Sequence, residues 1–138
     1  MKRICWICGG SGAYTGLQGV RDLLDIELTV ITTTSDSGGA QGVILAGDPS
    51  AVALADPMKC LVALATDSLT AQLYRHRFEG RPGDGLSDHR QTVGNVIWYG
   101  LLRMGLSPRE AVAYMAKHLA VRPHHRVEPV AIARSDLC

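Results

Sequence analysis

The stretch ICWICGGSG, residues 4–12, joins an apolar run to a glycine-rich loop, and it decides the fold. A second stretch, LTVITTTSDSGGAQG at residues 28–42, repeats this arrangement. Glycines let backbone N–H groups approach an anionic ligand because no Cβ is in the way, and a following helix adds its positive end. Two such loops at the carboxyl ends of neighbouring strands would share one edge of a sheet, where open α/β sheets bind ligands. The two stretches therefore predict an α/β fold and a phosphorylated ligand.

Length and composition indicate one ordinary globular domain, over residues 1–138. The chain is 46% hydrophobic and 20% charged, which allows a core without disulfides or metal. Its formal net charge of +1 does not create the positive potential that would attract nucleic acid or an anionic membrane. No segment is long and apolar enough to span a bilayer, and the apolar run after residues 1–3 is too short for a signal peptide. We therefore expect a cytoplasmic protein.

The cysteines offer one motif, the C-x-x-C spacing of Cys5 and Cys8. Residues three apart in a strand point to opposite faces, so these two thiols would not meet. A zinc site would need a second ligand pair, and His124 and His125 are adjacent residues that diverge. We expect buried structural cysteines in a reducing compartment, with no metal or redox role.

The hydrophobic pattern predicts three strands and five helices in a single α/β unit. The strands are expected over residues 2–8, 27–33 and 126–132. The first is expected to be a buried parallel strand because it is apolar on both faces. The helices are expected over residues 15–24, 57–65, 68–76, 92–104 and 108–119. Asp56 is the expected N-cap of the second helix, and Ser107 begins a capping box for the last.

The second glycine loop adds polar side chains to the backbone. Asp36 and Ser37 precede Gly38, Gly39 and Gly42. An Asp beside a phosphate cradle can hold a ribose hydroxyl or Mg²⁺. The alternative is a long exposed turn with the Asp as a helix N-cap. The first loop lacks the G-x-G-x-x-G fingerprint and the P-loop lysine, and by itself it also fits a tight strand-to-helix turn. The two loops together favour ligand binding.

Two further segments carry candidate ligand contacts. Arg75 and Arg77 end a predicted helix, where they either clamp a phosphate or offset the helix dipole. Gly94 and Asn95 open another helix and would present N–H groups to an anion, unless Thr92 simply caps that helix. Three histidines have no distinctive spacing and are expected at the surface: His118, His124 and His125.

Taken in order, the motifs of this chain resemble the CofD-like family. That family contains the gluconeogenesis factors, which are nucleotide-sugar-binding regulators of envelope growth, and 2-phospho-L-lactate transferase of coenzyme F420 synthesis. The resemblance runs over nearly the whole chain, through GGSG, TTTSDSGGAQG, DPMKCLVALA, LYRHRFEG, LSDHRQTVGNVIWYGLL and HLAVRPHHRVEPV. It implies a Rossmann-like three-layer fold with a parallel sheet. Because the family is much longer, the chain resembles its first half only, and we expect a truncated form of the family fold.

The chain departs from the family pattern at several ligand-facing positions. Ser37 replaces a second Asp, Val43 an Arg, and Met58 another Arg, while Asp56 and Lys59 remain. The resemblance and the motifs together give the candidate phosphate-binding residues Gly9, Gly10, Ser11, Gly12, Asp36, Ser37, Gly38, Gly39, Gly42, Asp56, Lys59, Arg75, Arg77, Gly94 and Asn95.

The resemblance leaves three functions open. The first is a regulatory, non-catalytic protein that binds a nucleotide-sugar, such as a UDP-sugar, or a dinucleotide. The second is a transferase of the 2-phospho-L-lactate type that uses Mg²⁺, for which Asp36 is the candidate ligand. The third is a degenerate half-protein that acts as a subunit. The expected partners are a phosphorylated small molecule and either a second copy of the chain or a protein that supplies the C-terminal half.

Overall fold

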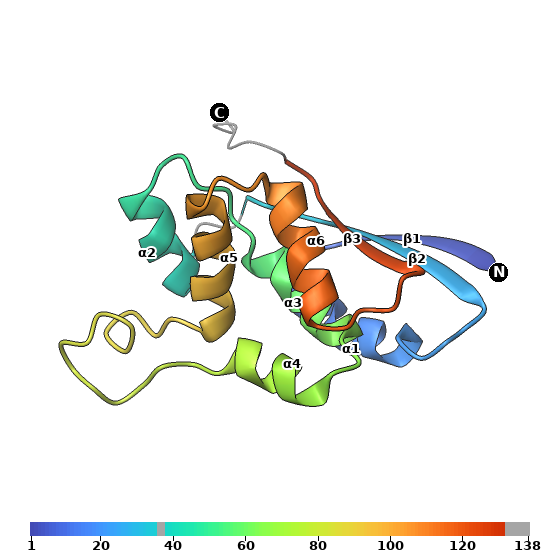
Figure 1. The fold of residues 1–138 in the computed structure, drawn as a ribbon, viewed down its shortest axis with the longest axis horizontal. Coiled ribbons are helices and arrows are strands. Elements are labelled where there is room, and N and C mark those ends of the chain that lie inside the picture. The colour runs from blue at the N-terminus through green and yellow to red at the C-terminus, as the bar shows by residue number, and fades with distance from the viewer. Residues whose placement is uncertain (36–37, 132–138) are drawn as a thin grey trace.

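The computed structural model describes residues 1–35 and 38–131 and contains a parallel sheet (Figure 1). Its strands are β1 (Lys2–Cys8), β2 (Ile26–Thr32) and β3 (His125–Pro129), in the order β1-β2-β3. The register pairs Ile4 with Leu28 and Leu28 with His125. The helices of the described residues are α1 (Gly10–Val20), α2 (Gly39–Gly47), α3 (Ala55–Leu64), α4 (Ser68–Arg75), α5 (Val93–Arg103) and α6 (Pro108–His118). The predicted Rossmann-like α/β fold is confirmed.

The first β-α-β unit forms as its sequence suggests, with one shift in the helix. α1 begins at Gly10, directly after β1, rather than at residue 15. Leu17 is fully buried, but Leu23 and Leu24 lie beyond the helix and are exposed. Gly16 leaves room for an indole, because a Cβ there would approach the Trp6 ring to 2.5 Å. The helix therefore packs against β1 through a glycine.

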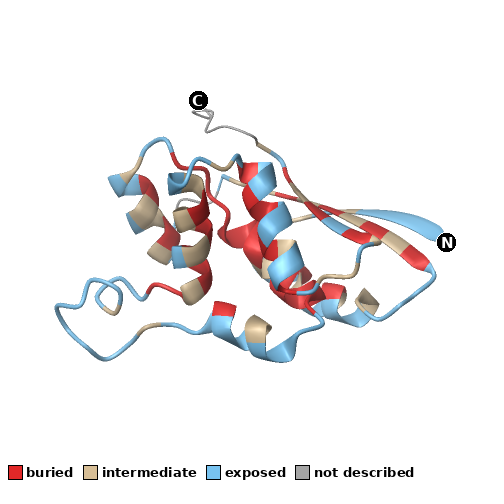
Figure 2. Ribbon diagram, viewed as in Figure 1, coloured by how far each residue is buried: buried red, intermediate tan, exposed pale blue. Residues whose placement is uncertain are grey.

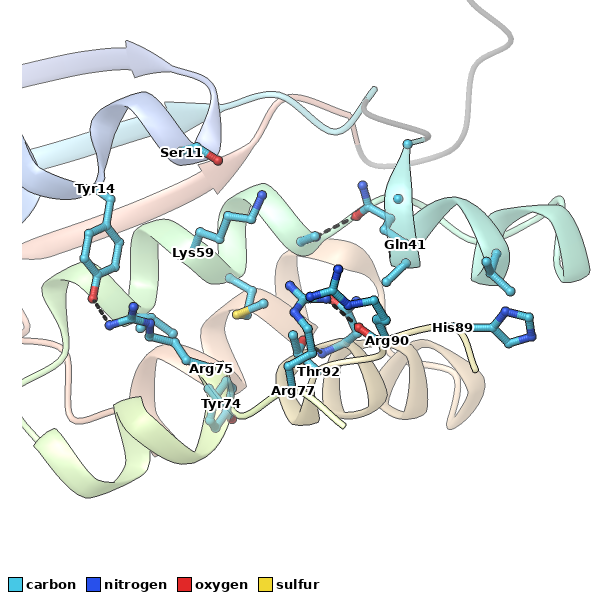
Figure 3. Close-up of a pocket in the computed structure, with 18 of the residues that line it drawn as sticks. Ser11, Tyr14, Gln41, Lys59, Tyr74, Arg75, Arg77, His89, Arg90 and Thr92 are labelled. Atoms are coloured by element: carbon cyan, nitrogen blue, oxygen red, sulfur yellow. Dashed lines mark hydrogen bonds between the residues drawn. The ribbon is translucent and has the colours of Figure 1, made fainter. Parts of the chain in front are cut away.

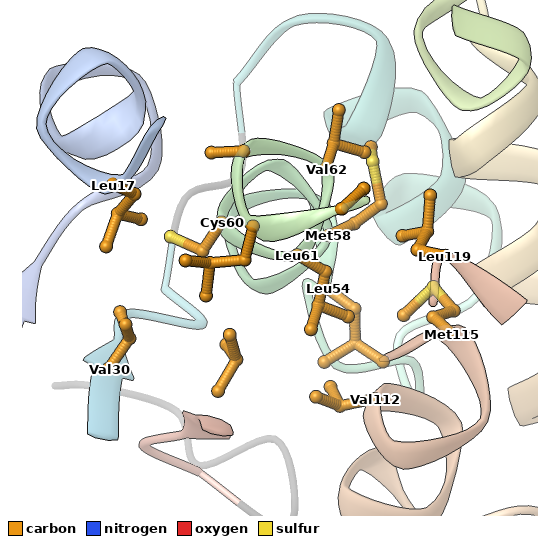
Figure 4. Close-up of a cluster of buried hydrophobic side chains, with 14 of the residues drawn as sticks. Leu17, Val30, Leu54, Met58, Cys60, Leu61, Val62, Val112, Met115 and Leu119 are labelled. Carbon is orange, nitrogen blue, oxygen red and sulfur yellow. The ribbon is translucent and has the colours of Figure 1, made fainter. Parts of the chain in front are cut away.

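The core is built around α3, which lies between α1 and α6 (Figure 4). Leu61 and Leu64 of α3 are fully buried. Leu17 of α1 and Val30 of β2 lie on one side of this helix. The other side is covered by residues of α6 and the residue after it: Val112, Met115 and Leu119. Because α3 is packed on both sides, the side chains on its remaining face are held in fixed positions.

The sheet is covered by helices on one face in the described part of the chain. Leu28, Val30 and Val127 point to the helices and are buried. The opposite face is exposed or half-exposed along all three strands, over Arg3, Cys5, Ile7, Glu27, Thr29, Ile31, Arg126 and Glu128. The prediction that β1 is buried is wrong, since it is an edge strand with mostly exposed residues (Figure 2). An apolar run does not distinguish a central strand from an edge strand.

Two helix predictions failed in the segment between β2 and α4. The five predicted helices do not include α2, which occupies Gly39–Gly47. Asp56 is not an N-cap, because α3 already begins at Ala55 with Leu54 as its N-cap. By contrast, Asp67, Thr92 and Ser107 do cap α4, α5 and α6 with their side chains. Within the described ranges, the structure has no helix long and apolar enough to cross a membrane.

Candidate functional site

A cavity of about 1210 Å³ opens where the first turns of several helices meet (Figure 3). α1 contributes Ser11, α2 contributes Gly39, and α3 contributes Ala55. α5 contributes Asn95, beside its N-cap Thr92. The N-terminus of a helix carries a partial positive charge and N–H groups without intrahelical partners. The backbone alone therefore makes one wall of this cavity attractive to an anion.

The two helices that follow the glycine loops begin without a side-chain cap. Gly9 and Gly38 are the N-caps of α1 and α2, and neither helix has an acidic residue in its first turn. The positive ends of these helices are therefore not offset by a carboxylate of their own first turn. α4 and α5 differ in this respect, since the side chains of Asp67 and Thr92 cap them.

Four cationic side chains line the same cavity: Lys59, Arg75, Arg77 and Arg90. Lys59 is half-buried on α3, while the three arginines are exposed around α4 and the loop before α5. Asp88 is the one carboxylate among the described lining residues, and it accepts hydrogen bonds from the backbone N–H of Gly83 at 2.9 and 3.0 Å. The lining is therefore strongly cationic.

The loop before α5 is held in an unusual backbone conformation at Arg90. Its φ of 50° lies in the left-handed region that non-glycine residues seldom adopt. The guanidinium of Arg77 donates to the backbone carbonyl of Arg90, and the Arg90 guanidinium pairs with Glu79 at 2.8 Å. Backbone strain of this kind persists only where the surroundings enforce it. The contacts thus hold Arg77 and Arg90 together at the cavity wall.

A chain of buried amides joins the ends of α2 and α5 behind the cavity. The Gln91 amide donates to the carbonyl of Ala40 at 2.7 Å and accepts from the Asn95 amide at 3.0 Å. Asn95 in turn accepts from the Trp98 indole at 3.2 Å. Gln91 and Asn95 are both 5% exposed. The side chain of Asn95 is thus engaged in positioning two helices, although it also lines the cavity.

A second, smaller cavity of about 360 Å³ lies beside the first turn of α1. Its lining includes Gly9, Ser11 and Gly12 from the first glycine loop, together with Asp56 and Lys59 from α3. The Lys59 ammonium pairs with the Asp56 carboxylate at 3.2 Å. Ser11 and Lys59 line both cavities, so an anion near Lys59 would be within reach of either.

The structure brings most of the predicted site residues together. The main cavity is lined by Ser11, Gly38, Gly39, Lys59, Arg75, Arg77 and Asn95, and the smaller one by Gly9, Gly12 and Asp56. Gly10 begins α1, and Gly42 lies within α2 without lining either cavity. Asp36 and Ser37 lie outside the described residues.

Gly94 has a packing role that the sequence did not reveal. It is buried in the first turn of α5, against Met58 and the backbone of Tyr74. A Cβ at this position would come within 3.0 Å of three atoms of these two residues. The glycine therefore lets α5 approach α3 and α4 closely and does not line the cavity.

Several lining residues had no signal of their own in the sequence. Tyr14, Gln41 and His89 belong to the cavity, and so does Arg90. The spacing of Ala55, Met58, Lys59 and Val62 along α3 could have indicated a helix face, and these four residues do share the cavity. The only signal for Arg90 in the sequence is its charge, two positions before the predicted helix over residues 92–104.

Most cysteines and histidines lie away from the two cavities, apart from His89 in the main cavity and Cys8 in the smaller one. Cys5 and Cys8 lie on opposite faces of β1 as expected, but the prediction that the cysteines are buried is wrong for Cys5, which is exposed on the open face of the sheet, and Cys8 is only half-buried. Cys60 is buried in the core, and this burial raises the pKa of its thiol to about 12. His125 is buried rather than at the surface, and burial lowers its pKa. Within residues 1–35 and 38–131, no three or more His, Cys, Asp or Glu residues are grouped so that they could hold a metal ion.

The parallel sheet and its helices define a Rossmann-like α/β protein with a cationic cavity at its helix starts. The chain belongs to the CofD family, whose description is 2-phospho-L-lactate transferase CofD and which it matches over residues 4–138. A relative from Pasteurella multocida, named "Putative gluconeogenesis factor", is 33% identical over 125 residues. A relative of the same name from Thermotoga maritima is 30% identical over 129 residues.

These relatives are much longer than the present chain. The alignments cover 90% and 93% of this chain but 39% and 38% of the two relatives. A crystal structure of a Bacillus halodurans protein superimposes with a TM-score of 0.82 at 29% identity, over 96% of this chain and 40% of that one. The chain therefore spans about two fifths of the length of the proteins it matches.

Proposed function

We propose that this chain binds a nucleotide-sugar or a dinucleotide and acts as a regulatory, non-catalytic binding protein. The observation that carries the proposal is the meeting of four cationic side chains with the glycine-capped starts of α1 and α2 in one cavity. Guanidinium groups and the backbone N–H groups at helix starts are strong hydrogen-bond donors to phosphate oxygens. The volume of about 1210 Å³ is large for a ligand site and suits an extended molecule.

A transferase reaction is the second candidate, favoured by the description of the family that the chain matches. Transfer of a phosphorylated group from a nucleoside diphosphate relies on positioning and on Mg²⁺, which favours carboxylate ligands. Asp88 is the one carboxylate among the described lining residues, and both of its oxygens accept from the backbone N–H of Gly83. Binding without turnover is therefore the function we place first.

Calorimetric titration tests the proposal with two probes, UDP-glucose and GDP, each with and without Mg²⁺. We expect saturable binding of UDP-glucose that does not need Mg²⁺. Lys59→Gln should weaken it about ten- to a hundredfold, because a charge-assisted hydrogen bond contributes about 1.5–3 kcal/mol. Lys117→Gln, an exposed lysine of α6 outside the cavity, should change affinity by less than about twofold.

Two results would contradict the proposal. If neither nucleotide nor inorganic pyrophosphate binds at millimolar concentration, the cavity is not an anion site. If Lys59→Gln and Lys117→Gln weaken binding equally, the ligand does not lie beside Lys59. Turnover of a guanosine diphospho donor only in the presence of Mg²⁺ would establish the transferase function instead.

A further inference from the structure

We propose that Tyr14 and Arg75 form a stacking subsite at one end of the main cavity, where the nucleobase of the ligand lies. The phosphates would then lie beside Lys59, Arg77 and Arg90, and the remaining part of the ligand toward Gln41 and His89. This inference rests on the proposed function and deepens it, because it assigns an orientation to the ligand.

Tyr14 and Arg75 are two planar side chains held against each other by direct contacts. The Arg75 guanidinium donates to the Tyr14 hydroxyl at 3.0 Å, and its central carbon lies 5.2 Å from the centre of the tyrosine ring. A second donor, the Gln18 amide, also reaches the Tyr14 hydroxyl at 3.3 Å. The ring is therefore held at both its face and its hydroxyl, which makes it an ordered surface rather than a loose side chain.

Figure 3 shows this pair at one end of the cavity and His89 at the other, with Lys59, Arg77 and Arg90 between them. Three of the four cationic side chains therefore lie in the middle of the cavity. A ligand that places its diphosphate beside the central cations would have a different moiety at each end.

The wall beside Tyr14 has an apolar component. Val62 lies one turn beyond Met58 and Lys59 on the cavity face of this helix, and Tyr14 and Thr15 of α1 complete the wall. α1 and α3 pack closely along their length. An apolar side chain, a tyrosine ring and a guanidinium plane are the surfaces on which nucleobases stack.

Arg75 has no carboxylate partner among the described residues, whereas Lys59 pairs with Asp56 and Arg90 with Glu79. An arginine that already contacts an aromatic ring keeps its second face and further N–H groups for a ligand. The pair can therefore stack on the base and reach the first phosphate at the same time.

The experiment compares UDP, UDP-glucose and inorganic pyrophosphate on the wild-type chain and on Tyr14→Ala, by calorimetry. Tyr14→Ala should weaken UDP and UDP-glucose about tenfold, because loss of base stacking has an effect of this size. Pyrophosphate has no ring, and its affinity should stay within about twofold. Tyr14→Phe keeps the ring and should restore most of the lost affinity.

Tyr114→Ala is the matched control, since Tyr114 is an exposed tyrosine of α6 outside the cavity and should leave all three affinities unchanged. Circular dichroism checks that each variant is folded. The inference is overturned if Tyr14→Ala weakens pyrophosphate as much as UDP, or if it leaves UDP unchanged while pyrophosphate binds. Either of those results would contradict the stacking subsite but not the anion site. If none of the three probes binds the wild-type chain, the proposed function is contradicted as well.

Discussion

A methyl group on Gly94 would meet the sulfur and methyl carbon of Met58 at 2.8 and 2.9 Å and the carbonyl oxygen of Tyr74 at 2.9 Å. Contacts this short force atoms to move, and the Tyr74 carbonyl belongs to the backbone of α4, which cannot rotate away as a flexible side chain can. Close helix contact at one glycine therefore holds α3, α4 and α5 in the arrangement that shapes the cavity.

Gly94→Ala should destabilise the fold by about 1–3 kcal/mol, the usual cost of overpacking. Gly100→Ala in the same helix is the control, because nothing lies within 4 Å of its added Cβ. That change should be neutral or stabilising by up to about 1 kcal/mol, since alanine favours helix interiors. Urea unfolding measures both. Equal stability of the two variants would show that Gly94 is not a close-packing position.

At the scale of elements, α3 depends on α2 for its N-terminal cap. The N-cap Leu54 has no acceptor side chain, and the buried Gln41 of α2 accepts instead from the Ala55 N–H at 2.8 Å. A side chain of α2 thus accepts a hydrogen bond from the first turn of α3, 14 positions further along the sequence. The cavity wall formed by these two helices is rigid for the same reason.

Gln41→Leu should lower the free energy of unfolding by about 1–3 kcal/mol, because it leaves a buried N–H without an acceptor. Gln72→Leu, at an exposed position of α4, should change it by no more than about 0.5 kcal/mol. Urea unfolding gives the free energies, and amide hydrogen exchange should show faster exchange at Ala55 in the Gln41 variant. Unchanged exchange at Ala55 would mean that the cap is unimportant.

At the scale of the whole molecule, the sheet presents one open face and two edge strands, β1 and β3, in the described part of the chain. Ile7 is 77% exposed on this face. Arg3 and Glu27 pair there at 3.1 Å, and Arg126 and Glu27 at 3.6 Å. An exposed sheet edge with apolar side chains tends to pair with another chain. We propose that the isolated chain covers this surface by forming a symmetric dimer.

Sedimentation velocity should detect this dimer at about tens of micromolar protein, an ordinary affinity for a weak dimer. Ile7→Asp should shift the chain to the monomer, because it places a charge on the apolar part of the open face. Leu69→Asp is the matched control, since Leu69 is 75% exposed but belongs to α4. A wild-type chain that stays monomeric, or two variants that behave alike, would refute association through this face.

Local signals in the sequence were enough for much of the fold. The capping box of Ser107 and Glu110 begins α6 as predicted, and Thr92 caps α5. The glycine loops do follow parallel strands and precede helices. These features depend on residues within about four positions of one another, and their hydrogen bonds form within one element. Helix caps and glycine loops can therefore be predicted from a short stretch of sequence, without knowledge of the rest of the chain.

What only the tertiary structure decided is the environment of each element. The exposure of β1 depends on which strands lie beside it, and α2 forms in a glycine-rich segment where propensity favours a loop. The cavity joins side chains from α1, α3, α4 and the loop before α5, and Gln91 meets Ala40 across 51 positions. Sequence alone determined the backbone parts of the candidate anion site. The fold determined which charged and aromatic side chains meet there, because contacts between distant segments form only when the core packs.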